Sequence, residues 1–225
     1  MFVGRWLDNG LQPGADARQK QRFSKSILHH RQGSAVSNTP STSPEKADVV
    51  QSFGSLIPVR LGLAQEVRHQ SVAALTRLLA HTIALRDLYK KSHWQTSGTT
   101  FFELHLLFDK HYGEQAQWMD ALGERVQALG GMARALARDV AEESRLSRGP
   151  SGIESTPTQL LRLVEAHEFV LEEARPMARD AAARGDEGTN DLIVSQVIRG
   201  NEQQCWFVAR HLGPAGGNEG RVDAR

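Results

Sequence analysis

Apolar residues recur at intervals of three and four over four long stretches of this chain, a spacing typical of one face of an α-helix. Clusters of glycine, serine, threonine and proline separate the stretches and favour turns and helix ends there. Only 6% of the residues are aromatic, whereas alanine, leucine, glutamate, arginine and glutamine are common and favour helices. The predicted helices cover about residues 61–94, 101–129, 158–184 and 190–212.

A longer connection, residues 131–157, joins the second predicted helix to the third, and a short helix fits near 133–145. Four long helices with one long connection in the middle are the arrangement of ferritin-like bundles. The sequence therefore predicts an all-α fold, a ferritin-like four-helix bundle with a long crossover that carries a short helix. We expect residues 58–213 to form this domain and residues 214–225 to form a flexible C-terminal tail.

Residues 1–57 differ in composition and predict a disordered, basic N-terminal extension. Residues 34–46 are rich in serine, threonine and proline and bury too little apolar surface to fold alone. Residues 1–60 carry eight lysine and arginine residues against four acidic ones, a net charge of 8 − 4 = +4. One interpretation of such a basic arm is non-specific contact with DNA phosphates. The alternatives are a solvated tail without a partner and a translation start placed too early. The candidate DNA-binding residues are Arg18, Lys20, Arg22 and Lys25.

Cysteine content and hydropathy bear on the compartment. The chain contains a single cysteine, Cys205, which excludes an internal disulfide and fits a reducing environment. No apolar run approaches the roughly 20 residues that a membrane span needs, and the first residues form no apolar leader. These features predict a cytoplasmic protein without a membrane partner, associated with the nucleoid if the arm binds DNA.

Imidazole and carboxylate side chains, ligand types that suit iron, recur along the second predicted helix. His105 and Asp109 lie four residues apart, and so do Asp120 and Glu124, so each pair shares a helix face. The step from Asp109 to Asp120 returns to nearly the same face but separates the pairs by roughly 16 Å along the helix. Because metal–ligand bonds are about 2 Å long, one ion cannot bind both pairs of one chain.

Two copies of this helix, packed antiparallel about a two-fold axis, bring the pairs together. The histidine–aspartate pair of one subunit then meets the aspartate–glutamate pair of the other, and symmetry generates a second site. His93, at the end of the first predicted helix, reaches the same site from its own subunit. We expect the axis near Glu114 and Gln115, where Gly113 would allow a close approach of the helices.

Each of these residues also has an ordinary interpretation. A lone helical histidine is usually a surface or core residue, and acidic residues at helical spacing usually form a solvated face. The joint arrangement, on a stripe interleaved with apolar residues, favours a metal site instead. The predicted iron ligands are His93, His105, Asp109, Asp120 and Glu124.

Two motifs resemble those of the Dps family (DNA-binding proteins from starved cells), also called mini-ferritins. HWQTSGTTFFELHLLFD, residues 93–109, matches the family pattern of two histidines, a glycine and an acidic residue, except that Thr96 replaces the usual valine or methionine. MDALGERVQALGGMA, residues 119–133, matches the second family motif at every constrained position. A looser resemblance covers about residues 48–213, and residues 1–47 fall outside it.

The resemblance implies that the five predicted ligands form a ferroxidase site shared between two subunits. Trp94 matches the tryptophan that lies beside the iron in the family, where it is an electron donor that quenches one-electron oxidants or simply an interface aromatic. Family members assemble into hollow dodecamers, prefer hydrogen peroxide as oxidant and store ferric mineral inside. The resemblance therefore implies a ferroxidase and iron-storage protein that protects DNA from oxidative damage.

Two alternatives stay open at this point. Zinc accepts the same ligands as iron and is a competitor for the site. An architectural DNA-compacting protein with an inactive or zinc-occupied centre would bind DNA without oxidising iron, and a generic helical bundle would do neither.

Overall fold

The computed structural model describes residues 48–213, and within them every regular element is a helix. Four long helical stretches and a short helix on the connection confirm the predicted all-α four-helix bundle. The elements are α1 (Gln65–Gln95), α2 (Phe101–Ala128), α3 (Ala137–Glu143), α4 (Thr156–Ala183), α5 (Glu187–Leu192), η1 (Ile193–Ile198) and α6 (Arg199–Arg210).

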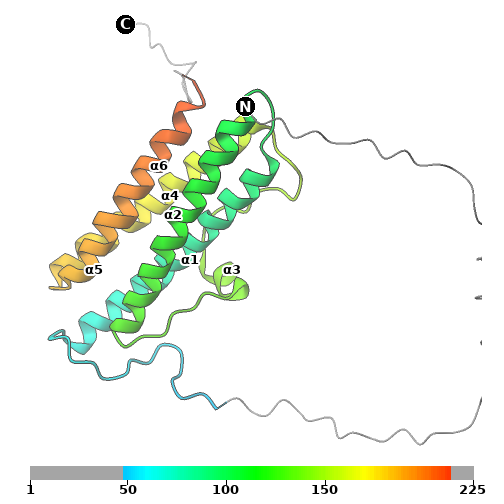
Figure 1. Cartoon of the computed structure of the whole chain (residues 1–225). Helices are drawn as coiled ribbons and strands as arrows, with labels where there is room; N and C mark the ends of the chain where they lie inside the picture. The colour runs from blue at the N-terminus through cyan, green and yellow to red at the C-terminus, as the bar shows by residue number, and fades with distance from the viewer. Residues whose placement is uncertain (1–47, 214–225) are drawn as a thin grey trace, which may run out of the picture. The chain divides into compact units, whose positions relative to one another are not determined.

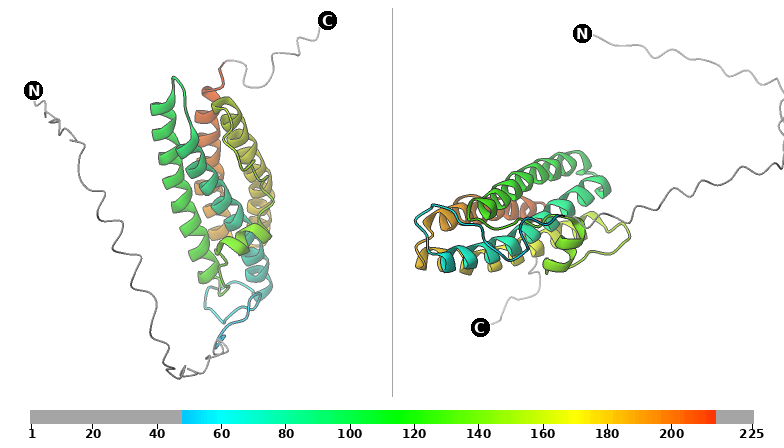
Figure 2. Two further views of the ribbon diagram at one scale, coloured as in Figure 1. Left: turned by 90° about the vertical axis from the view of Figure 1, so that its right-hand side faces the viewer. Right: turned by 90° about the horizontal axis from the view of Figure 1, so that it is seen from below.

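The helices form two antiparallel pairs that pack on each other (Figures 1 and 2). A short turn joins α1 to α2, whereas the connection from α2 to α4 is long and carries α3, which packs against α1. The second pair consists of α4 and the continuous run α5–η1–α6. None of the described helices has the length and apolar character that a bilayer span requires.

Helix ends follow local capping chemistry. Gly130 ends α2 with a backbone φ of +85°, and its N–H and that of Gly131 donate to the carbonyls of Gln127 and Val126, as in a Schellman motif. The N-cap residue of α4 is Ser155, whose hydroxyl accepts from the N–H of Thr158. These ends lie within two residues of the predicted ones.

The fourth long helix departs from the expected single α-helix in two ways. It begins at Glu187 because Asp186 caps it by accepting from the N–H of Thr189. Residues 193–198 then form a π-helical turn, in which one extra residue enters the ladder of hydrogen bonds. The apolar spacing carries no mark of such a turn, so it could not be predicted.

The core lies between the four long helices and consists mainly of leucine, with valine, phenylalanine and alanine. Gly200 in α6 lets Trp118 of α2 lie directly against its backbone, since a Cβ at Gly200 would stand 2.1 Å from the ring atom Cζ2. Residues with no or almost no exposed surface include Leu75, Leu79, Leu104, Phe108, Leu122, Leu163, Val170, Ile193 and Val208.

Residues 48–57, which the sequence prediction assigned to the extension, lie against the base of the bundle. The amide of Gln51 donates to the carbonyl of Gly130 at 3.0 Å, and the N–H of Ile57 donates to the same carbonyl at 2.9 Å. The guanidinium of Arg68 in α1 donates to the carbonyl of Ile57 at 3.2 Å. This segment therefore closes the end of α2 against the start of α1.

Candidate metal centre

His93 and His105 meet where the end of α1 passes the start of α2. Their imidazole rings stack with centroids 3.7 Å apart and planes inclined by 22°. Nδ1 of His93 lies 2.8 Å from the carbonyl oxygen of His105, and Nδ1 of His105 lies 3.0 Å from the carbonyl oxygen of His93. Each ring is therefore held by the backbone of the other helix.

These two contacts define the tautomer of both rings. A carbonyl oxygen only accepts hydrogen bonds, so Nδ1 carries the proton in each imidazole. In the neutral ring, Nε2 then holds a lone pair available to a metal ion. Donation of the second ring nitrogen to a carbonyl is the usual support of metal-binding histidines. In both half-buried rings, Nε2 is thus the nitrogen that a metal ion could bind.

Asp109 lies one helical turn after His105 and is exposed, with 51% of its side chain accessible. Its Oδ1 accepts from the ammonium of Lys90 at 2.5 Å, and this hydrogen bond lowers the pKa of the Asp109 carboxyl. The same ammonium lies 4.6 Å from the centre of the Tyr112 ring. Lys90 is absent from the predicted site, although its position three residues before His93, on the same face of α1, was a usable signal.

Asp120 and Glu124 lie on the second half of α2 and are exposed. Within residues 48–213 neither carboxylate forms a hydrogen bond or an ion pair. Together with Leu79 and Met119 they line an open hollow of about 510 Å³ beside the crossover. Free carboxylates at the edge of a hollow can accept a cation or a positively charged group from outside the subunit.

The described part of a single chain thus holds two incomplete groups of ligands. Around no single point do three histidine, cysteine, aspartate or glutamate side chains of residues 48–213 gather. One group is the stacked pair of imidazoles, with Asp109 one helical turn beyond His105. The other is Asp120 with Glu124, which begins eleven residues after Asp109 and roughly 16 Å further along α2. On the stripe between them, Gly113 has no heavy atom within 4 Å of where its Cβ would lie.

Apolar side chains surround the histidine group. Trp94 follows His93 and is 71% exposed, and Phe102 and Leu106 are 66% and 53% exposed. Phe101, 43% exposed, places its ring 5.2 Å from that of His105. Large exposed apolar side chains beside polar ones are typical of a surface that another protein covers. Thr96, the departure from the family motif, is 4% exposed, and its hydroxyl has no partner among the described residues.

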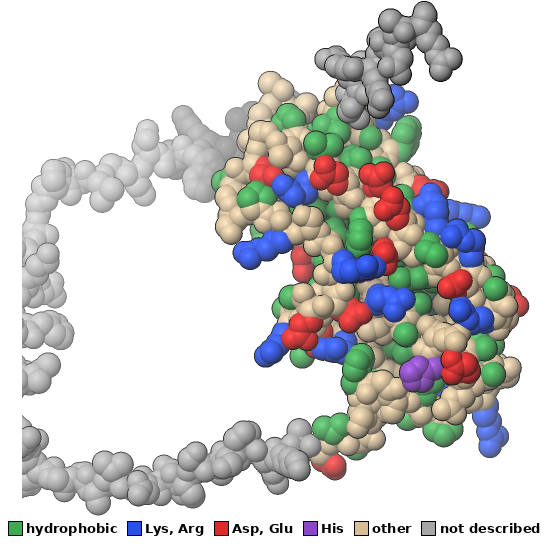
Figure 3. All heavy atoms as spheres, turned by 180° about the vertical axis from the view of Figure 1, so that it is seen from behind, with side chains coloured by type: hydrophobic (Ala, Val, Ile, Leu, Met, Phe, Trp, Pro, Cys, Tyr) green, Lys and Arg blue, Asp and Glu red, His purple; other side chains and the backbone are tan. Residues whose placement is uncertain are grey.

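The candidate DNA-binding residues Arg18, Lys20, Arg22 and Lys25 lie outside the described residues. Figure 3 shows the bundle from behind the view of Figure 1. On this face, basic and acidic side chains of the described residues are interspersed, without a continuous basic area.

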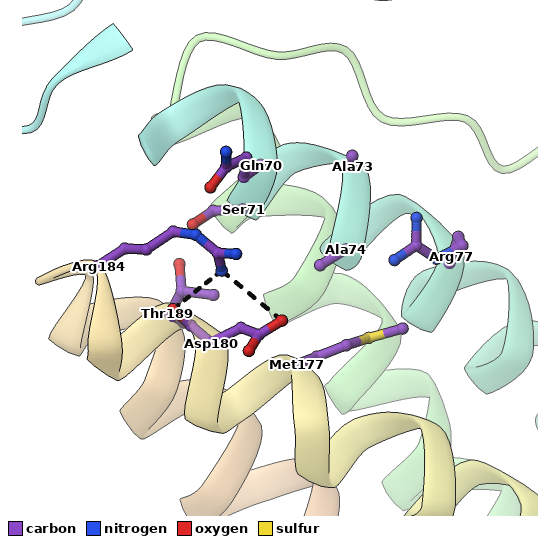
Figure 4. Close-up of a pocket in the computed structure, with 10 residues that line it drawn as sticks. Gln70, Ser71, Ala73, Ala74, Arg77, Met177, Asp180, Arg184 and Thr189 are labelled. Carbon is purple, nitrogen blue, oxygen red and sulfur yellow. Dashed lines mark hydrogen bonds and ion pairs between the residues drawn. The ribbon is translucent and has the colours of Figure 1, made fainter. Parts of the chain in front are cut away.

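A second pocket, of about 260 Å³, lies between α1 and the end of α4 (Figure 4). Arg184 turns towards Asp180 there, with Nη1 3.7 Å from Oδ2, and Ser71 and Thr189 contribute hydroxyls. The pocket contains neither imidazole nor thiol, and its one carboxylate already has a cationic partner. It offers less chemistry than the two groups on α2.

Comparisons with known proteins agree with the fold and with the family resemblance. Residues 72–215 match the model of the ferritin-like domain. DpsC from Streptomyces coelicolor is 46% identical and superposes with a TM-score of 0.72 over 77% of this chain and 99% of that chain. The nutrient stress-induced DNA-binding protein of a Synechococcus strain is 30% identical over 74% of this chain and 94% of its own length.

A Dps protein from Vibrio cholerae, described as a member of a superfamily of ferritin-like diiron-carboxylate proteins, is 26% identical. It superposes with a TM-score of 0.65 over 70% of this chain and 99% of that chain. The domain match, the curated relative and the solved structures all lead to one assignment. This chain belongs to the Dps family of ferritin-like proteins.

Proposed function

We propose that this protein oxidises ferrous iron with hydrogen peroxide at a centre completed by two subunits, and that it stores the ferric product. Each centre combines His93, His105 and Asp109 of one subunit with Asp120 and Glu124 of its neighbour. Iron is the substrate and leaves as mineral, so a centre with few, carboxylate-rich ligands suits it. Family membership supports iron storage in general, and the arrangement of the ligands supports this particular centre.

The reciprocal bonds of His93 and His105 carry the proposal. A half-buried imidazole in any role pairs its N–H, and either ring nitrogen can carry that proton. Here each Nδ1–H is committed to the other residue's carbonyl, and each Nε2 is left to an outside ligand. The carboxylate of Asp109, one turn away, adds the negative charge that a divalent cation requires.

Two ferrous ions at such a centre supply the two electrons that cleave the O–O bond of peroxide. Both oxygens then leave as water, and free hydroxyl radical is not released. The protein contributes ligands, proximity and open coordination positions for the oxidant. Trp94, next to His93, is in place to reduce a one-electron oxidant that escapes this pathway, or it serves as part of the interface.

Mixed oligomers test the shared centre directly. Variant one carries His105→Ala and Asp109→Asn, and variant two carries Asp120→Asn and Glu124→Gln. Each alone should lose peroxide-dependent iron oxidation. In a mixed dimer, one centre combines the intact groups of both variants and the other combines the damaged ones. Co-expression at equal levels should therefore restore about a quarter of the wild-type activity.

A centre built within one subunit predicts a different result, because no mixture of the two variants could then regain activity. The assay is iron oxidation on adding peroxide, with equal oligomer size of all samples as the control. Zn²⁺ added before iron, under anaerobic conditions, should inhibit iron oxidation by occupying the same ligands. DNA binding that persists without any iron oxidation would favour an architectural protein with an inactive centre.

Assembly into a dodecamer built from two-fold dimers, action in the cytoplasm and protection of DNA belong to the same proposal. Relatives named for DNA binding and for DNA protection during starvation support it. The basic segment with Arg18, Lys20, Arg22 and Lys25 is the part of this chain that we assign to DNA, by contact with phosphates and without reading of base sequence.

A further inference from the structure

A chain of hydrogen bonds between polar side chains runs through the middle of the bundle, inside the apolar core. All four long helical stretches contribute to it, and its members are buried to 1% exposure or less. Buried polar groups are costly unless they are paired, so such a network is unusual in a helical core that leucine would fill. Its members are Tyr89 of α1, His111 and Gln115 of α2, His167 of α4, and Asn201 and Gln204 of α6.

The direction of each hydrogen bond follows from Asn201. Its Nδ2 donates to the carbonyl of Val197 at 2.7 Å, so its Oδ1 is the atom 2.9 Å from Nδ1 of His167. The reverse amide orientation would set two oxygens against each other. His167 therefore carries its proton on Nδ1, and its Nε2 is an acceptor.

The hydroxyl of Tyr89 donates to that acceptor, with Oη 2.5 Å from Nε2 of His167. The same oxygen accepts from Nδ1 of His111 at 3.1 Å. Burial raises the pKa of the Tyr89 phenol and lowers the pKa of His167 to about 3, so both groups are neutral at rest. A neutral phenol thus faces a neutral base at short distance, where no water reaches either group.

This geometry suits removal of one electron from the phenol. A phenol that loses an electron becomes a strong acid and must release its proton as the electron leaves. In a dry core the electron leaves readily only if a base already stands at hydrogen-bond distance. Nε2 of His167 is that base, and Asn201 Oδ1 stabilises the imidazolium by accepting from Nδ1.

Tyr89 also lies close to the candidate centre. It precedes His93 by one helical turn on α1, a rise of roughly 6 Å. The ring of Phe108 lies 6.0 Å from the Tyr89 ring and belongs to the residue directly before Asp109. The other tyrosine, Tyr112, has its ring beside Lys90 and is only half-buried.

We propose that Tyr89 donates one electron to the iron centre and that His167 takes up its proton. The inference rests on the proposed function and applies when a centre holds a single ferrous ion. Reduction of peroxide then needs a second electron, which Tyr89 supplies while its proton moves from Oη to Nε2 of His167. One Fe²⁺, one H₂O₂ and two solvent protons yield one Fe³⁺, two waters, the Tyr89 phenoxyl radical and the His167 imidazolium.

The chain has two tyrosines, Tyr89 and Tyr112, and this makes the radical assignable. In the Tyr112→Phe variant, grown on ring-deuterated tyrosine, Tyr89 is the only labelled residue and its hydrogen bonds are unchanged. The assembled protein is mixed with less than one Fe²⁺ per centre and excess peroxide, then frozen within milliseconds for electron paramagnetic resonance. We expect an organic radical whose hyperfine structure narrows on deuteration.

Ferric iron is counted in the same samples, so the two proposals fail in different ways. Iron oxidation without a deuterium-sensitive radical overturns the role of Tyr89 and leaves the ferroxidase standing. Absence of iron oxidation overturns the ferroxidase, and the Tyr89 proposal with it. This test does not depend on whether a Tyr89→Phe variant folds.

His167→Gln examines the proton acceptor, since an amide oxygen accepts the hydrogen bond but is a far weaker base. We expect the radical to be lost or strongly reduced while iron oxidation with two Fe²⁺ per centre keeps its rate. An undiminished radical in this variant overturns the assignment of His167. Tyr112→Phe with normal His167 is the matched control.

Discussion

The ammonium of Lys90 lies 2.5 Å from Oδ1 of Asp109, so a candidate metal ligand is already neutralised by a neighbouring helix of its own chain. An incoming divalent cation must compete with this ion pair. The pair is solvent-accessible, with 28% of the lysine side chain and 51% of the aspartate side chain exposed. It is therefore weak enough to be displaced, and it affects how tightly the centre holds metal.

Replacing Lys90 by methionine should strengthen metal binding. The variant frees Asp109 from a surface ion pair worth up to about 1 kcal/mol, so the dissociation constant for Zn²⁺ should fall by up to about five-fold. Isothermal titration of the apo-oligomer measures it. Lys91→Met, which removes the adjacent lysine, is the control and should leave affinity unchanged. Weaker binding in Lys90→Met would mean that the lysine supports the centre.

A leucine at Gly113 should leave the subunit folded and abolish its assembly. No heavy atom lies within 4 Å of a Cβ at this position, so the fold has room for a side chain, and leucine is a better helix former. If two α2 helices cross here, the side chain separates them and both shared centres are lost. Sizing chromatography should show subunits that no longer assemble, and iron oxidation should be lost with them. The circular dichroism spectrum should still show the helix content of the wild type. An oligomer of full size would exclude the crossing at this point.

Asp186→Asn should destabilise the bundle by about 3 kcal/mol, because it leaves Arg125 without its charged partner, 2.5 Å away. The carboxylate is 1% exposed and accepts from Ser71, from Thr189 and from Arg125. Urea unfolding at fixed protein concentration measures the change. Asp180→Asn, whose side chain is 66% exposed, is the control and should cost less than about 1 kcal/mol.

The same aspartate predicts a pH dependence. Burial alone would raise the pKa of Asp186, but hydrogen bonds from Ser71 and Thr189 and the charge of Arg125 outweigh burial and lower it. Because the folded pKa lies below the unfolded value of about 3.9, the stabilisation is complete above that value and is lost as the pH falls through the folded pKa. The stability gap between wild type and Asp186→Asn should therefore be constant near neutrality and narrow in acid.

Gly200→Ala should cost about 1–3 kcal/mol, because the new methyl group collides with the Trp118 ring. In a Trp118→Leu background the same substitution should instead be neutral or stabilise by up to about 1 kcal/mol, since alanine is the better helix former. The double-mutant cycle in urea isolates this coupling. Equal effects in both backgrounds would show that the tryptophan simply moves aside.

A chain that begins at residue 48 should keep its oligomeric state and iron oxidation but lose DNA binding. The full-length protein should shift DNA in gels, with an affinity that falls steeply with salt as counterions rebind. Twelve arms on one shell would strengthen binding through avidity. Equal binding by both proteins at each salt concentration would assign DNA contact to the bundle instead.

The helices could be predicted because their signals are local. Apolar spacing located α1, α2 and α4, and residues such as Gly130 and Ser155 ended or capped them near the expected positions. The π-turn was not predictable, because Ile193–Ile198 keeps an apolar spacing that an α-helix also shows. Local sequence thus reports where a helix lies more reliably than how its turns are wound.

The candidate site likewise has features that local sequence predicts and features that depend on contacts between helices. His105 and Asp109 share a face by helix geometry alone, so their pairing could be derived from sequence, whereas the contact of Lys90 with Asp109 joins two helices. The partners of Tyr89, His167 and His111, come from two different helices, and nothing local in sequence links them. The meeting of the two ligand groups across subunits stays a prediction for the experiments above.

The π-turn at Ile193–Ile198 changes which side chains of α6 face the core, because its extra residue rotates the rest of the helix about its axis. Deleting one residue from this turn would restore a regular α-helix and rotate everything after it by about 100°. Asn201 and Gln204 would then leave the polar network, and Gly200 would no longer face Trp118. Loss of the turn and loss of the network should therefore occur together when related sequences diverge, so that the length of this segment records whether the proton acceptor His167 still has Asn201 as its hydrogen-bond partner.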